Sequence, residues 1–105
     1  MDNTLKVFIT SVLRYDDKKT KEPKLRIAYV NQEKGACQNN ERLKGFPELS
    51  AFVNFSDNAW NGIELKDFYQ PATFTFEPQR APYDPLKVIN VLKKIEVNGK
   101  TISIL

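Results

Sequence analysis

The 105-residue sequence contains no histidine and only one cysteine. Histidine is the commonest general base and metal ligand near neutral pH, so its absence excludes Ser–His–Asp and Cys–His hydrolases and His-containing zinc sites. Cys37 has no second cysteine with which to form an internal disulfide, which favours a reducing compartment. The glycines are few and scattered, so no Gly-rich phosphate loop is present. These absences argue against an enzyme, and no residue pattern indicates a metal or a cofactor.

Long apolar runs are also missing. No stretch approaches the roughly 20 apolar residues that a membrane-spanning helix needs. The first residues, MDNTLKVFIT, lack the basic, apolar and small-residue order of a signal peptide. We therefore expect a cytoplasmic protein that does not associate with a membrane. A length of 105 residues fits one domain, residues 1–105, and 41% hydrophobic and 28% charged residues are typical of a globular chain.

Apolar and polar residues alternate through most of the chain, which predicts β-strands. The strands are expected at residues 5–15, 24–32, 48–55, 63–68, 72–76, 88–97 and 101–105. Asn98-Gly99 predicts a type I′ turn between the last two strands. Residues 38–44 are expected to form a short helix that ends at Gly45, residues 56–62 a turn, and the proline-rich residues 78–85 a stiff extended loop. The predicted fold is all-β with at most one short helix. Within this class, the sequence predicts a small OB-like antiparallel Greek-key β-barrel. A closed barrel is favoured because an open sheet of so few strands would leave its edges exposed.

The net charge of +3 is distributed unevenly along the chain. Residues 1–44 hold ten Lys or Arg against six Asp or Glu, whereas residues 45–86 hold two against six. Residues 87–105 hold four basic residues and one acidic residue. The chain therefore has two basic ends and an acidic middle, and a fold that brought the two ends together would concentrate positive charge.

The first predicted hairpin combines basic and aromatic residues. Strict alternation puts the basic residues and one phenylalanine of the first strand on one face of the hairpin. The basic residues of the second strand lie on the same face, and the connecting loop adds three lysines. This combination is typical of a protein surface that binds single-stranded nucleic acid. The cations contact phosphates, and bases stack on the ring. An ordinary solvated outer face remains the alternative, because antiparallel strands commonly carry Lys and Arg there. The residues concerned are Lys6, Phe8, Arg14, Lys18, Lys19, Lys21, Lys24 and Arg26.

Three further residues are candidates for nucleic-acid binding. Trp60 lies in an Asn-rich segment, where it would either stack on a base or cover one end of a barrel. Arg80 and Tyr83 lie in the proline-rich segment, which would present them at little cost in ordering entropy. The alternative for Tyr83 is that its ring fills the core.

The segment Lys18-Lys19-Thr20-Lys21-Glu22-Pro23-Lys24, set between two strands, resembles the opening of small OB-fold single-stranded DNA-binding proteins of phages and mobile elements. The resemblance covers about the first 30 residues, together with the overall size and strand count. It implies a five-stranded Greek-key barrel that binds single strands across its second and third strands and the neighbouring loops. It also implies that the polar residues 31–47 hold an inter-strand connection or a short helix.

We therefore expect a non-catalytic protein that binds single-stranded DNA or RNA with little sequence preference. A host or replication protein is a further expected partner, and a homodimer stays open. The alternative function is a protein–protein interaction module or inhibitor that docks on a host enzyme through its charge-segregated surfaces.

Overall fold

The computed structural model describes residues 3–81 and 83–104. Six strands form one antiparallel sheet in the order β5-β2-β1-β6-β7-β8. These strands are β1 (Asn3–Asp16), β2 (Pro23–Asn31), β5 (Leu49–Asn54), β6 (Pro71–Ala81), β7 (Asp84–Val97) and β8 (Lys100–Ser103). The short strands β3 (Gln38–Asn39) and β4 (Lys44–Gly45) form a separate hairpin. The described residues contain one α-helix, α1 (Asp57–Gly62), and two 3₁₀ turns, η1 (Lys34–Ala36) and η2 (Leu65–Asp67), which confirms the predicted β-rich class.

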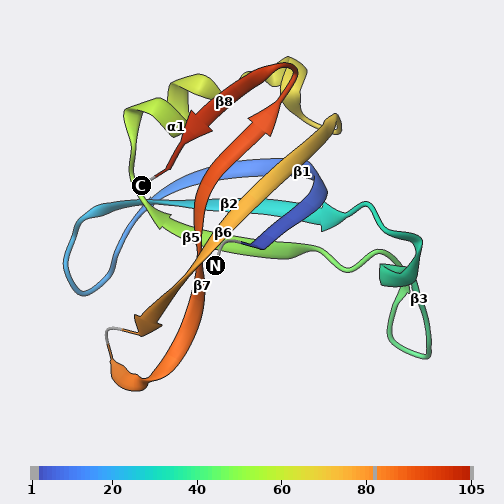
Figure 1. The fold of residues 1–105 in the computed structure, drawn as a ribbon, viewed down its shortest axis with the longest axis horizontal. Coiled ribbons are helices and arrows are strands. Elements are labelled where there is room, and N and C mark those ends of the chain that lie inside the picture. Colours follow the sequence, from blue (N-terminus) through green and yellow to red (C-terminus); the bar gives the residue numbers. More distant parts are fainter. Residues whose placement is uncertain (1–2, 82, 105) are drawn as a thin grey trace.

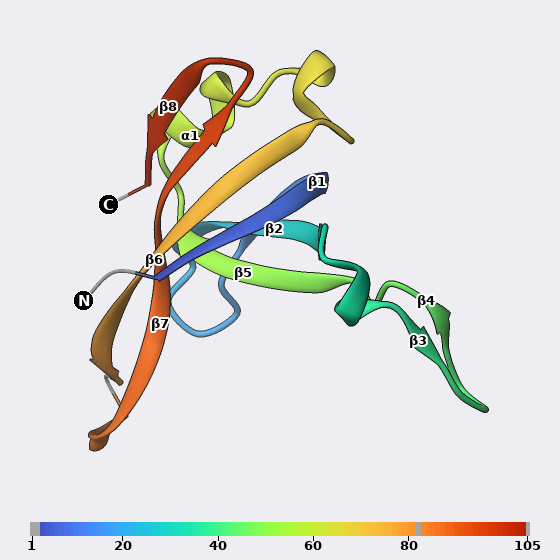
Figure 2. The same cartoon turned by 45° about the vertical axis from the view of Figure 1, so that its right-hand side comes forward.

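The sheet folds across itself, so that β1, β2 and β5 cross β6 and β7 (Figure 1). The core lies between these two groups of strands and contains Ile9, Leu25, Ile27, Phe74 and Ile95, all fully buried. Among the described residues the hydrogen-bonded ladder ends at β5 and at β8, so the sheet is not closed into a barrel. The β3–β4 hairpin projects from the body, as does the far part of the β6–β7 hairpin (Figure 2). We call the latter, residues 77–81 and 83–90, the arm.

A β-bulge in β1 reverses which side chains face the core. Ile9 lies opposite Tyr29, but Ser11 lies opposite Ala28, so Thr10 is an extra residue in the ladder. Before the bulge, Val7 and Ile9 point into the core. After it, even-numbered residues of β1 take the inner side, opposite the buried side chains of β2. The bulge also lies just beyond the point where the β1–β6 ladder ends, so β1 bends away from β6 there.

The acidic middle of the chain folds differently from the expectation. Residues 57–62 form α1 rather than a turn, because the Ser56 hydroxyl accepts the Ala59 N–H at 3.4 Å and Ala59 packs in the core. The strand predicted at residues 63–68 is wrong, because η2 occupies this segment. The Glu64 N–H donates to the Asp67 carboxylate at 2.8 Å and closes that turn.

Two loops are also corrected by the structure. The helix predicted at residues 38–44 is wrong, because Asn40 Oδ1 accepts the N–H groups of Arg42 and Leu43, each at 2.9 Å, and forms the turn between β3 and β4. The proline-rich segment is the end of a hairpin rather than an extended loop, although its Pro82 lies outside the described residues. The predicted Asn98-Gly99 turn is confirmed, with φ angles of 51° and 78°.

A buried carboxylate fixes η2 to the β7–β8 hairpin. Asp67 is 0% exposed, and its carboxylate lies 2.6 Å from Lys100 Nζ and accepts the Asn98 amide at 2.7 Å. Burial would raise the pKa of Asp67, but the bonds from Lys100, the Glu64 N–H and Asn98 outweigh it and hold the pKa below its usual value. The same contact with Asp67 raises the pKa of Lys100. The pair therefore stabilises the fold while both side chains are charged. This stabilisation is lost at acid pH, where Asp67 binds a proton, and at alkaline pH, where Lys100 loses one.

We predict that Asp67→Asn lowers the free energy of unfolding by about 2 kcal/mol near pH 7, because a buried charged network loses its anion. Urea unfolding of the variant and the wild type measures this difference. The difference should shrink as the pH falls below about 4, because Asp67 then binds a proton in the unfolded state, and it should vanish below the lowered pKa of the folded state. Asp16→Asn, at an exposed position, is the matched control. A difference that stays constant down to about pH 2 would contradict the assignment.

Candidate nucleic-acid interface

The outer sides of β1, β2 and β5 form one exposed surface. Because the bulge shifts β1 by one residue, the odd-numbered residues after it share the outer side with the basic residues of β2. Two rows cross the three strands, one through Leu13, Arg26 and Phe52 and the other through Tyr15, Lys24 and Asn54. We call these six residues the Phe52 face.

The Phe52 face presents an aromatic ring beside two cations. Phe52 is 64% exposed, and the Tyr15 ring meets it edge-on with the centroids 6.5 Å apart. Arg26 Nε donates to the Ser50 hydroxyl at 3.0 Å, and Lys24 Nζ donates to Asn54 Oδ1 at 2.8 Å. Within the described residues no carboxylate lies in ion-pair contact with either cation. Both cations are therefore held by hydrogen bonds to neutral groups, and the Lys24 charge also acts on the Asp17 carboxyl and helps to lower its pKa.

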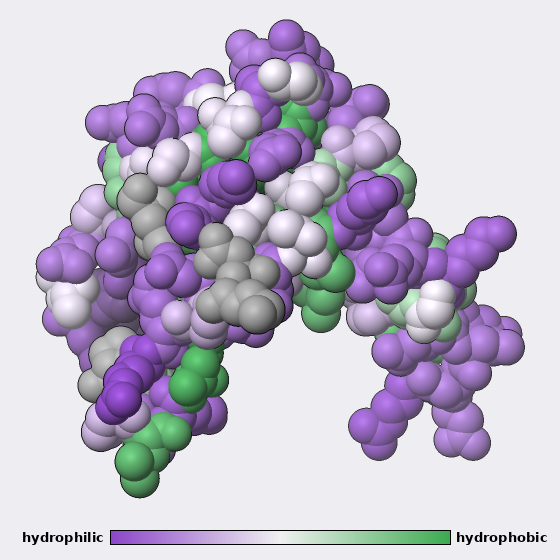
Figure 3. All heavy atoms as spheres, viewed as in Figure 1, coloured by the Kyte–Doolittle hydropathy of each residue, from purple (hydrophilic) through white to green (hydrophobic). Residues whose placement is uncertain are grey.

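A groove adjoins this face along β5. It consists of two cavities of about 630 and 720 Å³ that share Phe52 and Val91. The larger cavity runs from Tyr15 and Lys24 to Gln79 on the arm. Figure 3 shows the surface hollowed between the arm and the β3–β4 hairpin, the two projections that border β5. The groove is thus long enough to continue from the Phe52 face toward β7.

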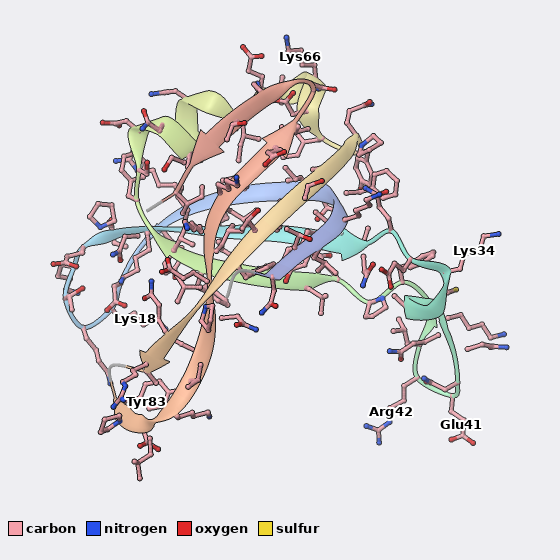
Figure 4. The ribbon with its side chains drawn as sticks, in the orientation of Figure 1. Lys18, Lys34, Glu41, Arg42, Lys66 and Tyr83 are labelled. Atoms are coloured by element: carbon pink, nitrogen blue, oxygen red, sulfur yellow. The ribbon has the colours of Figure 1, made fainter. Side chains whose placement is uncertain are left out.

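The loop between β1 and β2 has a defined shape. Asp17 Oδ1 accepts the N–H groups of Lys19 at 2.8 Å and Thr20 at 3.1 Å, and Lys21 adopts a left-handed φ of 64°. The backbone hydrogen bonds from Thr20 and Lys19 lower the pKa of the Asp17 carboxyl. Lys18, Lys19 and Lys21 are exposed on this loop, whose Asp17 lines the larger cavity of the groove. In Figure 4 the Lys18 side chain extends from this loop on the same side of the molecule as Tyr83.

The arm carries two of the predicted site residues. Tyr83 is exposed, with Lys87 Nζ 5.7 Å from its ring centroid, so this ring does not fill the core. Arg80 is also exposed, and its guanidinium donates to the Pro85 carbonyl at 3.5 Å. Both side chains lie on the projection that borders the groove.

Three of the predicted residues lie elsewhere. Arg14 is on the inner side of β1, opposite Leu25, with its guanidinium carbon 4.3 Å from the Phe55 ring centroid. The prediction that Arg14 shares a face with Lys24 and Arg26 is wrong, because alternation does not continue through the bulge. Lys6 and Phe8 lie on the part of β1 before the bulge. Lys6 is exposed beside Thr73 of β6, and Phe8 is half-buried between Val30 of β2 and Pro71 of β6.

Trp60 is also separate from the Phe52 face. It belongs to α1, is 39% exposed, and lines its own cavity of about 450 Å³ with Val12, Ile63 and Phe68. Figure 1 places α1 at the end of the molecule opposite the arm. The two basic ends of the chain are likewise not joined by strand pairing, since β8 pairs only with β7, and β1 pairs with β2 and β6.

Sequence reasoning missed most of the apolar part of this surface. Phe52 and Asn54 alternate with the buried Ala51 and Val53, so their outward direction was predictable, but neither was selected as a binding residue. Strict alternation puts Leu13 and Tyr15 on the same face as the core residues Val7 and Ile9, because the bulge has no distinct sequence signal. Sequence reasoning does not find the β3–β4 hairpin, which carries the exposed Arg42 at its tip, with the exposed Lys34 of η1 near its base (Figure 4).

Comparisons of the chain with protein-family models, with curated proteins and with solved structures give no match. Within residues 3–81 and 83–104, no helix is long and apolar enough to cross a membrane. The same residues contain no group of three His, Cys, Asp or Glu side chains that could hold a metal ion.

We predict that Phe52→Ala changes the free energy of unfolding by less than about 0.5 kcal/mol, because an exposed ring contributes little to folding. Phe74→Ala, which removes a fully buried ring, should lower it by about 4 kcal/mol. Urea unfolding at neutral pH measures both changes. A large loss for Phe52→Ala would mean that this ring serves the fold rather than a ligand.

Proposed function

We propose that this chain is a non-catalytic protein that binds single-stranded nucleic acid across the Phe52 face and its groove. The observation that carries the proposal is the exposed Phe52 ring beside Lys24 and Arg26, two cations with no carboxylate in ion-pair contact among the described residues. Single-stranded nucleic acid offers the complementary chemistry, because phosphates bind cations and bases stack on exposed rings.

The order of the strands supports an OB-like interpretation of the fold. β1 pairs with both β2 and β6, and α1 lies between β5 and β6. In an OB-fold, a five-stranded and partly open barrel, the second and third strands and the loops beside them bind oligonucleotides. In this chain those strands correspond to β2 and β5, and the loops to residues 17–22 and the end of the arm. The Phe52 face occupies the same position.

Each group in this surface has a distinct part in the proposed binding. Phe52 stacks on a base, and Tyr15 supports the ring from its edge. Arg26, Lys24 and the loop lysines contact successive phosphates, while Tyr83 offers a second ring on the arm. Stacking and phosphate contacts tolerate any base, because every base has a π-face and every nucleotide a phosphate. The expected binding therefore has little sequence preference.

The local charge sets the expected strength of binding. The Phe52 face and the loop between β1 and β2 together carry five cations. The same part of the chain carries three carboxylates, those of Asp16, Asp17 and Glu22. This surplus of two is small, so about three phosphate contacts are a reasonable upper estimate and the slope of log K against log salt should be about −2. Binding should be micromolar near physiological salt. The cations are Lys18, Lys19, Lys21, Lys24 and Arg26.

We predict that the protein binds a fluorescent oligo-dT of about 15 nucleotides, with an affinity that falls as salt rises. Phe52→Ala should weaken binding about tenfold through the lost stacking contact. Arg26→Gln should also weaken binding and reduce the salt slope by about 0.7, the share of one phosphate contact. Fluorescence anisotropy across a salt series measures the affinity and the slope together.

Arg14→Gln is the matched control, because it removes the same charge from the same sheet but from the inner side of β1. This variant should retain the affinity and the salt slope of the wild type. Absence of binding at low salt, or an affinity that does not respond to salt, would refute the proposed function. Equal losses for Arg14→Gln and Arg26→Gln would refute the Phe52 face as the site.

A further inference from the structure

The smaller cavity of the groove differs in chemistry from the larger one. It opens where β5 and β7 come close to each other near the middle of the molecule (Figure 1), with no ladder between them among the described residues. Its volume of about 630 Å³ is in the range of small-ligand sites. The larger cavity includes the charged Asp17 and Lys24, whereas the described residues that line the smaller one are all uncharged. We call the smaller one the Tyr29 cavity.

Tyr29 brings an unused hydroxyl to this cavity. The side chain is only 8% exposed, and its ring meets the Phe74 ring edge-on with the centroids 4.9 Å apart. Within residues 3–81 and 83–104 the Tyr29 hydroxyl has no hydrogen-bond partner. In the same part of the chain, Thr10 carries the only fully buried side-chain polar atom without a partner. The Tyr29 hydroxyl therefore reaches solvent, and it does so in the cavity that Tyr29 lines.

The Tyr29 hydroxyl is a hydrogen-bond donor over a wide pH range. Burial raises the pKa of Tyr29, so the hydroxyl keeps its proton at neutral pH and well above it. A buried polar group without a partner costs free energy, and a ligand that accepts its hydrogen bond recovers that cost. The hydroxyl thus favours a ligand with an acceptor atom that reaches into the cavity.

The rest of the cavity suits a flat group with polar edges. Phe76 is half-buried, and its ring centroid lies 6.5 Å from that of Tyr29, so an aromatic surface forms one wall. Leu5 and Leu92 add apolar surface, and the exposed Asn90 brings an amide to the rim. Aromatic and apolar walls, a few polar groups and no charge match a nucleobase, which is uncharged near neutral pH, better than a phosphate.

The Tyr29 cavity is continuous with the Phe52 face. Phe52 lines both cavities of the groove. Ser50 lines the Tyr29 cavity, and its hydroxyl accepts the Arg26 Nε–H at 3.0 Å. A phosphate that Arg26 binds therefore lies beside the mouth of the cavity. Since the base and the phosphate of a nucleotide are joined through one sugar, a base can enter the cavity while a neighbouring base stacks on Phe52.

We propose that the Tyr29 cavity takes up one base of the bound single strand, and that the Tyr29 hydroxyl donates a hydrogen bond to this base. The inference rests on the proposed function and adds to it a site that encloses a base. Every base has a ring nitrogen or a carbonyl oxygen that accepts such a bond. The cavity is therefore compatible with binding of little sequence preference.

Tyr29→Phe tests the hydroxyl, because the change removes one oxygen atom that has no partner among the described residues. The variant should unfold in urea as the wild type does. In fluorescence anisotropy it should bind oligo-dT about fivefold more weakly, the effect of one lost hydrogen bond. Its salt slope should equal that of the wild type, because no phosphate contact is lost. Tyr69→Phe, the same change at an exposed tyrosine after η2, is the matched control and should not alter the affinity.

A methyl NMR titration with thymidine tests the cavity without phosphate contacts. Thymidine carries a base but no phosphate, so it should shift the methyl signals of Leu5 and Ala51, which line the cavity, with a Kd on the order of 10 mM. The methyl signals of the exposed Leu65 on η2 should not move. Deoxyribose 5-phosphate, which carries a phosphate but no base, should leave the signals of Leu5 and Ala51 unchanged.

This proposal and the proposed function fail through different results. A Tyr29→Phe variant with wild-type affinity, or Leu5 and Ala51 signals that do not respond to thymidine, would each overturn the cavity as a base site. Salt-dependent binding of oligo-dT that is weakened by Phe52→Ala would support the proposed function even then. Absence of oligo-dT binding by the wild type would refute both.

Discussion

The extra residue at Thr10 determines how the rest of this molecule is arranged. Before it, β1 pairs on both edges, with β2 and β6, and its odd-numbered side chains fill the core. After it, β1 pairs with β2 alone and its inner and outer side chains exchange places. A regular strand would have kept Arg14 on the outer side with Arg26. The bulge places Leu13 and Tyr15 there instead, next to an exposed Phe52.

The structure therefore separates three regions with different physical requirements. One end is fixed by the buried Asp67–Lys100 contact, which binds η2 to the last hairpin. The Phe52 face lies on β1, β2 and β5, at one edge of the sheet, and leaves the Phe52 ring and Arg26 open to solvent. The arm projects from the other end (Figure 1) and carries the exposed Tyr83, Leu86 and Val88. The weak net charge of +3 did not reveal this separation, because the basic residues lie on several faces.

Regular alternation made β1, β2 and β5 predictable, and Asn98-Gly99 made the last hairpin predictable. Features that depend on a single side-chain hydrogen bond were not predicted. The Ser56 cap that starts α1 and the Asn40 turn between β3 and β4 are examples, since both residue types are equally common in loops. The bulge was missed because Ile9, Thr10, Ser11 and Val12 form a run of residues that suits a regular strand. Its position depends on where β6 leaves β1, a contact between distant parts of the chain.

The central claim is that the bulge divides the basic residues and leaves Arg26, but not Arg14, on the binding surface. The Nε–H signals of the arginine side chains report on this directly in an NMR titration with oligo-dT. The account predicts that the Arg26 signal shifts progressively while the Arg14 signal, held over the Phe55 ring, does not move. A shift of the Arg14 signal with an unchanged Arg26 signal would contradict it.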